Sequence, residues 1–290
     1  MGKEGPRPVG VVAPFRVRLW VRGGPLLLAL IGTLIWFAGP AFSAQLPVYV
    51  YHEPGVGGYG YLDAPKQVET EAFHLHMAQA LVGALTDAGF TASVIDAKEG
   101  LRICNERRRC VIVDICQYPS HLLFAGQEGS PIAEWLRAGG IMVYSGDWPF
   151  FWYVGGDGKT LGEGANSFGD DKVFGADLVR EGFVDIAVAP TDAGKKWLPS
   201  LSAGGTMRPF DADAVAAACP WHEFYSLGKR TEADGTVHTA ADALCFRVPK
   251  GDGFFAAFHL RRGSHTDTNQ IIYEFLTKRL AGVLAEGGKP

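Results

Sequence analysis

The sequence predicts an α/β fold, with a doubly wound, mostly parallel sheet and helices on both of its faces. Three observations lead to this prediction. Apolar, β-branched segments alternate with segments of helical periodicity between residues 46 and 146. The segment CVIVDIC, residues 110–116, is apolar nearly throughout, as expected for a strand buried on both faces. The connections suit right-handed crossovers onto one sheet.

The first half of the predicted domain has the order strand, helix, strand, strand, helix, strand. Runs of β-branched and aromatic residues predict the strands, and apolar residues at helical spacing predict the helices. The second helix begins with Ser130 as its cap and Pro131 in its first turn, and it stops at Gly139. The predicted segments are residues 46–52, 69–90, 91–97, 110–116, 130–140 and 140–146.

The second half is less regular, and we predict an irregular insertion at about residues 155–245. Within it, residues 183–190 are consistent with a strand. Residues 243–260 predict two strands joined by a hairpin-type turn at Lys250–Gly253. Residues 266–285 predict a strongly amphipathic final helix.

Residues 1–44 differ from the rest of the chain. Five basic residues and one acidic residue precede an apolar run, and small residues follow it. This pattern predicts a cleaved secretory signal, with one domain at residues 45–290 and an exported location, periplasmic or extracellular. The alternative is an uncleaved anchor, which would be the only contact with a membrane. The apolar run from Pro25 to Phe37 is short for spanning a bilayer.

The charge of the chain argues against a nucleic-acid partner. The formal net charge is −4, and removal of residues 1–44 makes it −8. The only basic cluster, Arg102–Cys110, is short, and a solvated turn explains it. We expect a small-molecule or carbohydrate partner instead.

Five cysteines in an exported chain favour disulfides. We predict the pairs Cys104–Cys110 and Cys219–Cys245, and a buried free thiol at Cys116. No CxxC or HxxxH pair occurs, so no metal site is predicted.

In a doubly wound sheet, the ligand-binding and catalytic residues lie at the carboxyl ends of the strands. His52 and Glu53 follow the first predicted strand and are candidate ligand-binding residues. Asp114, Ser145 and His259 lie at the ends of later strands and are candidate catalytic residues.

The chain resembles the class I glutamine amidotransferase-like superfamily, near its secreted, trehalose-utilisation-like branches. The opening strand with its Gly-rich loop, VIVDICQYP, IAEWLRAGGIMVYSGD and GFFAAFHLRRGSHTDTNQIIYEFLTKRL carry the resemblance. It implies a flavodoxin-like layout over most of residues 45–155 and 245–285. Catalytic members have a cysteine after the fourth strand, where this chain has Ser145, and no acid follows His259 directly. The resemblance therefore implies a domain without glutaminase activity.

The stretch SGDWPFFWYV, residues 145–154, holds the densest aromatic run in the chain. We expect some of its rings in the core and others at a ligand lip. Exposed Trp and Tyr beside a carboxylate suit carbohydrate, so Asp147 and Trp148 are candidate ligand-binding residues. Tyr59, in a Gly-rich loop that lacks a phosphate-binding motif, is a third.

The sequence thus predicts an exported binding domain with no cofactor and with a small polar ligand, such as a carbohydrate, at the strand ends. One alternative is a hydrolase that uses Ser145 or a His/carboxylate pair. Another is a structural envelope protein with partner contacts only.

Overall fold

The computed structural model describes residues 46–56, 67–124, 128–146, 149–158, 160–162, 169–179, 186–206, 209–259 and 266–288. All of them belong to the unit Ala44–Pro290. The predicted signal, residues 1–44, lies outside the described residues, and so does most of the Gly-rich loop that contains Tyr59. Within the described part, no helix is both long and apolar enough to cross a bilayer.

Five parallel strands form one half of the main sheet. Their spatial order is β2-β1-β3-β4-β12, so the first strand lies between the second and the third. The apolar runs that predict strands in the sequence become these strands, which confirms the α/β class. Their bounds are β1 Val48–Tyr51, β2 Ala92–Ile95, β3 Val111–Ile115, β4 Ile141–Gly146 and β12 Phe254–His259.

Antiparallel strands form the other half of the same sheet and continue it in the order β11-β10-β7-β8. Most of these strands come from residues 155–245, for which the sequence predicts an irregular insertion. That prediction is corrected: the region extends the sheet. The bounds are β7 Ile186–Pro190, β8 Gly204–Thr206, β10 His222–Thr231 and β11 Val237–Arg247, with β9 Phe210–Asp211 paired to β11.

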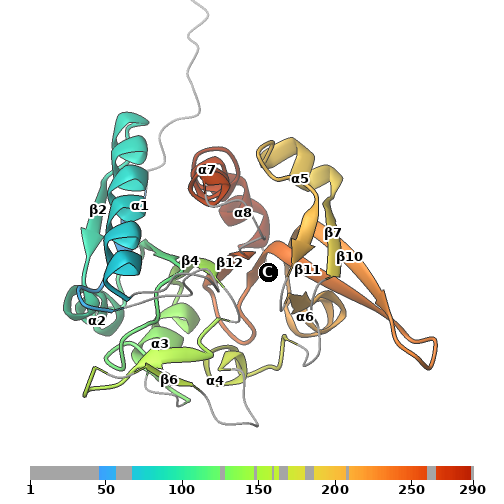
Figure 1. Cartoon of the computed structure of the whole chain (residues 1–290), viewed down its shortest axis with the longest axis horizontal. Helices are drawn as coiled ribbons and strands as arrows, with labels where there is room; N and C mark the ends of the chain where they lie inside the picture. Colours follow the sequence, from blue (N-terminus) through green and yellow to red (C-terminus); the bar gives the residue numbers. More distant parts are fainter. Residues whose placement is uncertain are drawn as a thin grey trace, which may run out of the picture. The chain divides into compact units, whose positions relative to one another are not determined.

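Helices cover both faces of this sheet (Figure 1). On one face lie α1 Gln67–Asp87, α5 Asp192–Trp197, α7 Thr266–Glu274 and α8 Leu280–Gly287. On the other lie α2 Ala97–Asn105, α3 Pro131–Arg137, α4 Asp170–Phe174 and α6 Ala212–Ala218. The two faces are called the α1 face and the α3 face below.

Aromatic side chains dominate the core on the α3 face. Phe255 packs against Tyr144 and Phe174, with ring centroids 6.0 and 4.8 Å apart. Phe150, from the aromatic run 145–154, is 1% exposed and joins this cluster. Each such ring contributes roughly 1.5–3 kcal/mol through burial.

The helix α2 is absent from the sequence prediction. Asp96 lies within the predicted second strand, residues 91–97, and caps this helix, because its side chain accepts a hydrogen bond from the backbone N–H of Glu99 at 2.9 Å. An Asp followed three residues later by Glu is a capping pattern, so the sequence contained the signal. Ser130 is the N-cap residue of α3, as predicted, but its side chain makes no capping hydrogen bond.

The final helix is not continuous. A π-helical turn, η1 Phe275–Arg279, separates α7 from α8. Such a turn inserts extra backbone into a helix and changes the direction of the side chains after it. Here Arg279 is buried, and its guanidinium bonds Glu223 on β10 and Glu286 on α8, at 2.8 and 2.6 Å.

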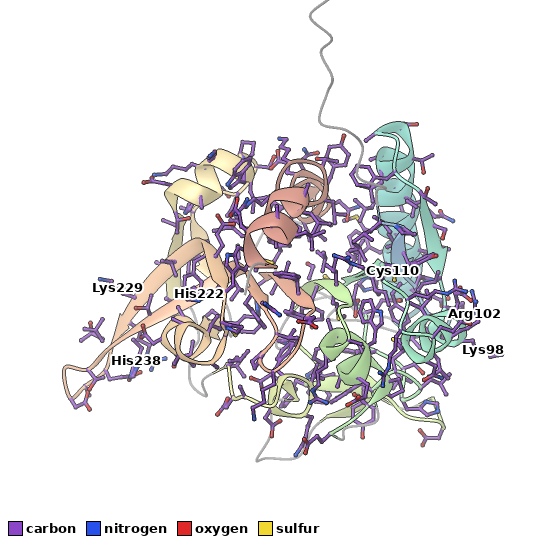
Figure 2. The ribbon with its side chains drawn as sticks, turned by 180° about the vertical axis from the view of Figure 1, so that it is seen from behind. Lys98, Arg102, Cys110, His222, Lys229 and His238 are labelled. Carbon is purple, nitrogen blue, oxygen red and sulfur yellow. The ribbon has the colours of Figure 1, made fainter. Side chains whose placement is uncertain are left out.

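The predicted turn at Lys250–Gly253 is confirmed, and it joins the two halves of the sheet. β11 and β12 pair antiparallel on either side of it. Gly253 is required there, because a Cβ atom would collide with the carbonyl oxygens of Leu136 and Gly140. A second hairpin, β10–β11, carries Lys229 and His238 near its end (Figure 2).

Candidate functional site

The carboxyl ends of the parallel strands lie at one edge of the sheet, and the predicted site residues follow them. Asp114 is in register with Tyr51 on β1 and Tyr144 on β4. Ser145 is in register with Ile115 on β3 and Phe258 on β12, and His259 with Gly146. The structure therefore brings Asp114, Ser145 and His259 to neighbouring strand ends, as the sequence predicts.

These three residues do not share a face of the sheet. Successive side chains of a strand point to opposite faces, and in-register neighbours point to the same one. Asp114 and His259 therefore lie on the α3 face, where His259 packs edge-to-face on Phe210 at 5.4 Å. Ser145 lies on the α1 face. The sheet itself separates the serine from the two groups that would activate it.

Ser145 is completely buried. Its hydroxyl contacts the Cys116 thiol, with Sγ and Oγ 3.6 Å apart, and its carbonyl accepts a hydrogen bond from the Cys116 N–H at 2.6 Å. Among the described residues, no histidine or carboxylate bonds its hydroxyl. A serine nucleophile needs such a base within hydrogen-bond reach.

Cys116 lies at the carboxyl edge, although it is not among the site residues that the sequence predicts. It directly follows β3 and has a φ of 63°, the left-handed region that residues with a side chain rarely occupy. The predicted buried free thiol is confirmed. Burial raises the pKa of Cys116 to about 12, so the thiol is protonated and unreactive at neutral pH.

Asp114 and Tyr51 form a buried polar pair on the α3 face. Burial raises the pKa of Asp114 well above its usual value, while a hydrogen bond from the Gln117 N–H at 3.0 Å acts in the opposite direction. Burial, with Asp114 beside it, also raises the pKa of Tyr51, whose hydroxyl accepts a hydrogen bond from the Ser120 N–H. Both groups stabilise the loop that follows β3.

Glu53 and Gln117 connect the ends of three strands. Gln117 accepts a hydrogen bond from the Glu53 N–H at 2.8 Å and donates one to the Val56 carbonyl at 3.3 Å. The Glu53 carboxylate accepts one from the Ala97 N–H at 2.7 Å, at the first turn of α2, where a helix favours negative charge. Glu53, a predicted ligand-binding residue, therefore connects the carboxyl end of β1 to the segments that follow β2 and β3.

Two imidazoles lie together beneath this edge on the α1 face. His52 follows β1 and is 5% exposed, and His74 on α1 is 2% exposed. The pKa of His74 is lowered to about 4, mainly by burial; the Ile115 backbone opposes this shift, and the neighbouring His52 adds to it. In the described part of the chain, Nε2 of His52 has no hydrogen-bond partner. A buried imidazole nitrogen without a partner is costly unless something binds it.

Partly exposed aromatic rings border the same edge. Tyr118, Phe151 and Trp152 form a group that we call the aromatic lip; Phe151 meets Trp152 edge-to-face at 5.0 Å, and Tyr118 lies 6.5 Å from Trp152. The lip is fixed because β5 (Trp152–Val154) exchanges backbone hydrogen bonds with the loop after β3, at Pro119 and His121. Of the described rings in the aromatic run, Phe150 is buried, whereas Phe151, Trp152 and Tyr153 are partly exposed.

Three predicted ligand-binding residues, Tyr59, Asp147 and Trp148, lie outside the described residues. The predicted disulfides need correction, because the structure holds all five cysteines as free, buried thiols. Each cysteine packs within the main core, where a free thiol behaves as a small apolar side chain.

No three His, Cys, Asp or Glu side chains of the described residues come together as a metal site. His52 and His74 alone offer two nitrogen ligands, fewer than the three that catalytic zinc sites use.

Replacing Ser145 with Ala is expected to change the free energy of unfolding by less than about 1 kcal/mol, because only a weak contact to Sγ is lost. Urea unfolding measures this change. Thr191→Ala is the comparison, since that hydroxyl caps α5 and donates to the Phe224 carbonyl; it should cost about 1–2 kcal/mol. A larger loss for Ser145→Ala than for Thr191→Ala would contradict this assignment.

Comparisons with known proteins assign no family. No family model and no curated protein matches the chain. Among solved structures, the chain is similar to an exo-β-1,4-mannosidase from an Opitutaceae bacterium, at 12% identity and a TM-score of 0.35. The match covers 83% of this chain but only 34% of the mannosidase chain.

A cytoplasmic protein from Salmonella typhimurium is also similar, at 14% identity and a TM-score of 0.39, with 80% of this chain and 97% of that protein covered. Both TM-scores are too low to transfer an activity or a location to this chain.

Proposed function

We propose that the chain is an exported binding domain of the amidotransferase-like type, without glutaminase activity, that holds a small polar ligand such as a carbohydrate at the carboxyl edge of its sheet. The observation that carries the proposal is the aromatic lip, whose partly exposed rings follow β3 and β4 at this edge. On the α1 face of the same edge, Nε2 of His52 is buried and, among the described residues, has no hydrogen-bond partner. Rings stack on the apolar faces of sugars, and imidazoles bond hydroxyl groups.

The strand order supports the flavodoxin-like layout that the resemblance implies. The order β2-β1-β3-β4-β12 corresponds to 2-1-3-4-5 in that layout, and helices lie on both faces. The direction of the strand order reverses between β1 and β3, the point at which such folds bind ligands. His52 and Cys116 follow these two strands.

The chemistry of the edge supports binding over catalysis. The serine at the position of the family nucleophile is buried on the α1 face, away from Asp114 and His259. The one thiol at the edge, Cys116, has a raised pKa. Neither side chain is activated in the way that nucleophilic catalysis requires.

The test is a thermal-shift and calorimetric screen of the protein against neutral sugars, amino acids and metal ions. We expect a saturable, sugar-selective increase in Tm. Trp152→Ala should weaken the selected sugar about tenfold, because truncation of a stacking Trp costs more than about 1 kcal/mol. Trp152→Phe, which keeps a ring, should retain most of the affinity.

Trp221→Ala is the matched control, because this half-buried Trp packs on Phe254 at the opposite end of β12. The Trp221→Ala variant should bind the sugar with the same affinity as the wild type. Unchanged affinity in Trp152→Ala, or the absence of any sugar-dependent shift, would contradict the proposal.

A purely structural role in the envelope has less support. A docking protein of that kind exposes a contiguous apolar patch. Among the described residues, Val237 is the one large hydrophobic side chain classed as exposed, at 52%.

A further inference from the structure

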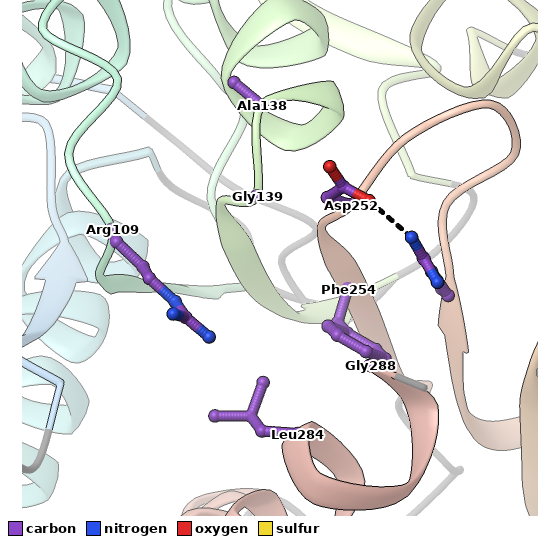
Figure 3. A pocket seen from close by; sticks show the side chains of 8 residues that line it. Arg109, Ala138, Gly139, Asp252, Phe254, Leu284 and Gly288 are labelled. Carbon is purple, nitrogen blue, oxygen red and sulfur yellow. Dashed lines mark hydrogen bonds and ion pairs between the residues drawn. The ribbon is translucent and has the colours of Figure 1, made fainter. Parts of the chain in front are cut away.

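A cavity lies at the opposite edge of the sheet, at the amino ends of β3, β4 and β12. We call it the amino-edge pocket. It has a volume of about 280 Å³. Eight residues line it, from the loop before β3, the end of α3, the β11–β12 turn and the end of α8: Arg109, Ala138, Gly139, Arg247, Asp252, Phe254, Leu284 and Gly288 (Figure 3).

The walls of this pocket are fixed by backbone contacts. The Asp252 N–H donates to the Arg137 carbonyl at 3.1 Å, and the Phe254 N–H donates to the Gly140 carbonyl at 3.0 Å. These bonds attach the β11–β12 turn to the end of α3. On the α8 side, a Cβ atom at Gly287 would press against the Phe254 ring, so helix and strand are in close contact. The cavity is therefore preformed.

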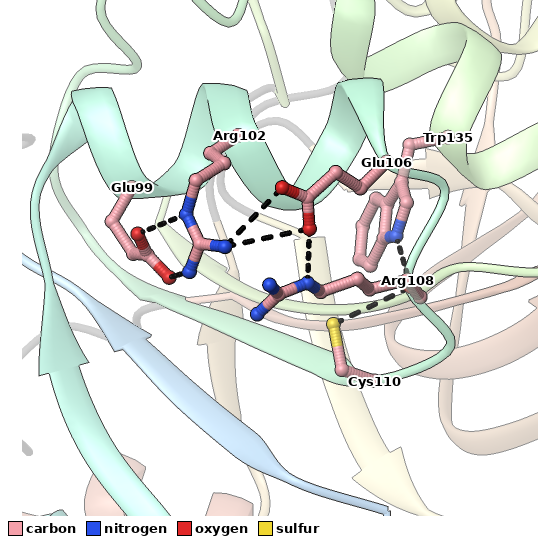
Figure 4. A network of polar contacts seen from close by, with 6 residues as sticks. All are labelled: Glu99, Arg102, Glu106, Arg108, Cys110 and Trp135. Carbon is pink, nitrogen blue, oxygen red and sulfur yellow. Dashed lines mark hydrogen bonds and ion pairs between the residues drawn. The ribbon is translucent and has the colours of Figure 1, made fainter.

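The loop that presents Arg109 is fixed as well. The Trp135 indole donates to the Arg108 carbonyl at 2.8 Å (Figure 4). Two residues further along the chain, the Cys110 carbonyl accepts a hydrogen bond from the Ile141 N–H at 3.2 Å. Arg109 lies between these two anchors, and its side chain points into the pocket (Figure 3).

The two arginines of the pocket differ in their partners. Arg247 pairs with Asp252 and donates to the Gly251 carbonyl at 3.0 Å. Arg109 is exposed and has neither an ion pair nor a hydrogen bond in the described part of the chain. The pocket thus presents one uncompensated positive charge, although the chain as a whole has a net charge of −4.

The remaining wall is apolar. Phe254 and the partly exposed Leu284 stand beside Arg109. A planar guanidinium binds a carboxylate through two parallel hydrogen bonds, and the neighbouring side chains favour an apolar body. The pocket has one unpaired positive charge among its described residues, at Arg109. The C-termini of α3 and α8 also face it, and helix C-termini disfavour additional negative charge. We therefore expect a ligand with one negative charge rather than a polyphosphate.

We propose that the amino-edge pocket binds small monocarboxylates with an apolar body, with Arg109 holding the carboxylate and Phe254 and Leu284 contacting the body. This site lies at the opposite edge of the sheet from the carboxyl ends of the parallel strands. The monocarboxylate proposal is therefore independent of the function proposed for the carboxyl edge.

Calorimetric titration of the full chain with benzoate tests the proposal, with benzamide and inorganic phosphate as comparison ligands. We expect saturable benzoate binding, with benzamide and phosphate at least about tenfold weaker. Arg109→Gln should weaken benzoate about tenfold or more. Leu284→Glu, which adds a negative charge to the pocket wall, should abolish benzoate binding.

Arg107→Gln is the matched control: this neighbouring exposed arginine does not line the pocket, so benzoate affinity should stay within about twofold of the wild type. All the variants change side chains that are at least partly exposed, and a thermal melt of each confirms its folding. The proposal is overturned by benzoate affinity in Arg109→Gln equal to that of the wild type, by equal binding of benzamide or phosphate, or by no benzoate binding at about 10 mM.

Discussion

Replacement of Arg279 with Met should lower the free energy of unfolding by about 3 kcal/mol, a large fraction of the stability of a domain. Arg279, in the π-helical turn η1, is 3% exposed, and its guanidinium pairs with Glu223 on strand β10. Removal of the cation leaves that carboxylate partly buried without its partner. Urea unfolding at neutral pH, with an unchanged m-value, measures the loss.

Two further variants separate the buried pair from general effects on the C-terminal helix. Lys278→Ala removes the adjacent ammonium, which pairs with Glu274. That carboxylate is buried but keeps its hydrogen bonds from the N–H and hydroxyl of Ser200, at 3.1 and 3.0 Å, so this variant should cost less than Arg279→Met. The double variant Arg279→Met/Glu223→Gln removes both charges and should recover part of the stability. Equal losses for Arg279→Met and Lys278→Ala would show that the ion pair is unimportant.

The second large effect is a loss of stability in acid through His74. Its pKa is lowered from 6.5 to about 4 in the folded protein. Between these values the unfolded chain binds more protons than the folded one, so stability falls as the pH decreases from 6.5 to about 4. Below pH 4 both states are protonated and this loss stops growing. For the buried imidazole the full effect is about 3 kcal/mol.

The difference in unfolding free energy between His74→Leu and the wild type, measured from pH 7 to pH 4, isolates this contribution. The variant should lack the acid-dependent loss. Subtraction is needed because burial raises the pKa of Asp170 from 3.8 to about 7, which makes stability fall as the pH rises across that range. His76→Leu, on the exposed face of the same helix, should keep the wild-type pH profile. A parallel profile for His74→Leu would refute the assignment.

The parallel half of the fold could be predicted from the sequence because each of its elements has a local signal. CVIVDIC marks β3, and Pro131 and Gly139 bracket α3. In the antiparallel half, the prediction covers β7 and the end of β11 but not β8, β9 or β10, because those strands are stabilised by distant partners. β10 contains Gly228 and Lys229, which lower strand propensity, and it forms because it pairs with both β11 and β7.

The site was predictable in position but not in detail. Topology alone brings the ends of β1, β3, β4 and β12 to one edge, and that edge carries His52, Asp114, Ser145 and His259. The face on which each side chain lies depends on the strand register. Asp114 and Ser145 belong to successive residue pairs of β3 and β4, so their side chains point to opposite faces. The left-handed backbone of Cys116 and its contact with Ser145 depend on tertiary packing, which no sequence pattern records.

The hairpin that joins the two halves of the sheet also sets an order of events during synthesis. β12 completes the parallel half beside β4, yet roughly one hundred residues separate these strands, and closing so long a loop is slow. β10 and β11 need only their own short turn to pair. While the chain is being made, β4 therefore keeps an open edge until β12 emerges, and this edge is the segment most in need of protection from premature association.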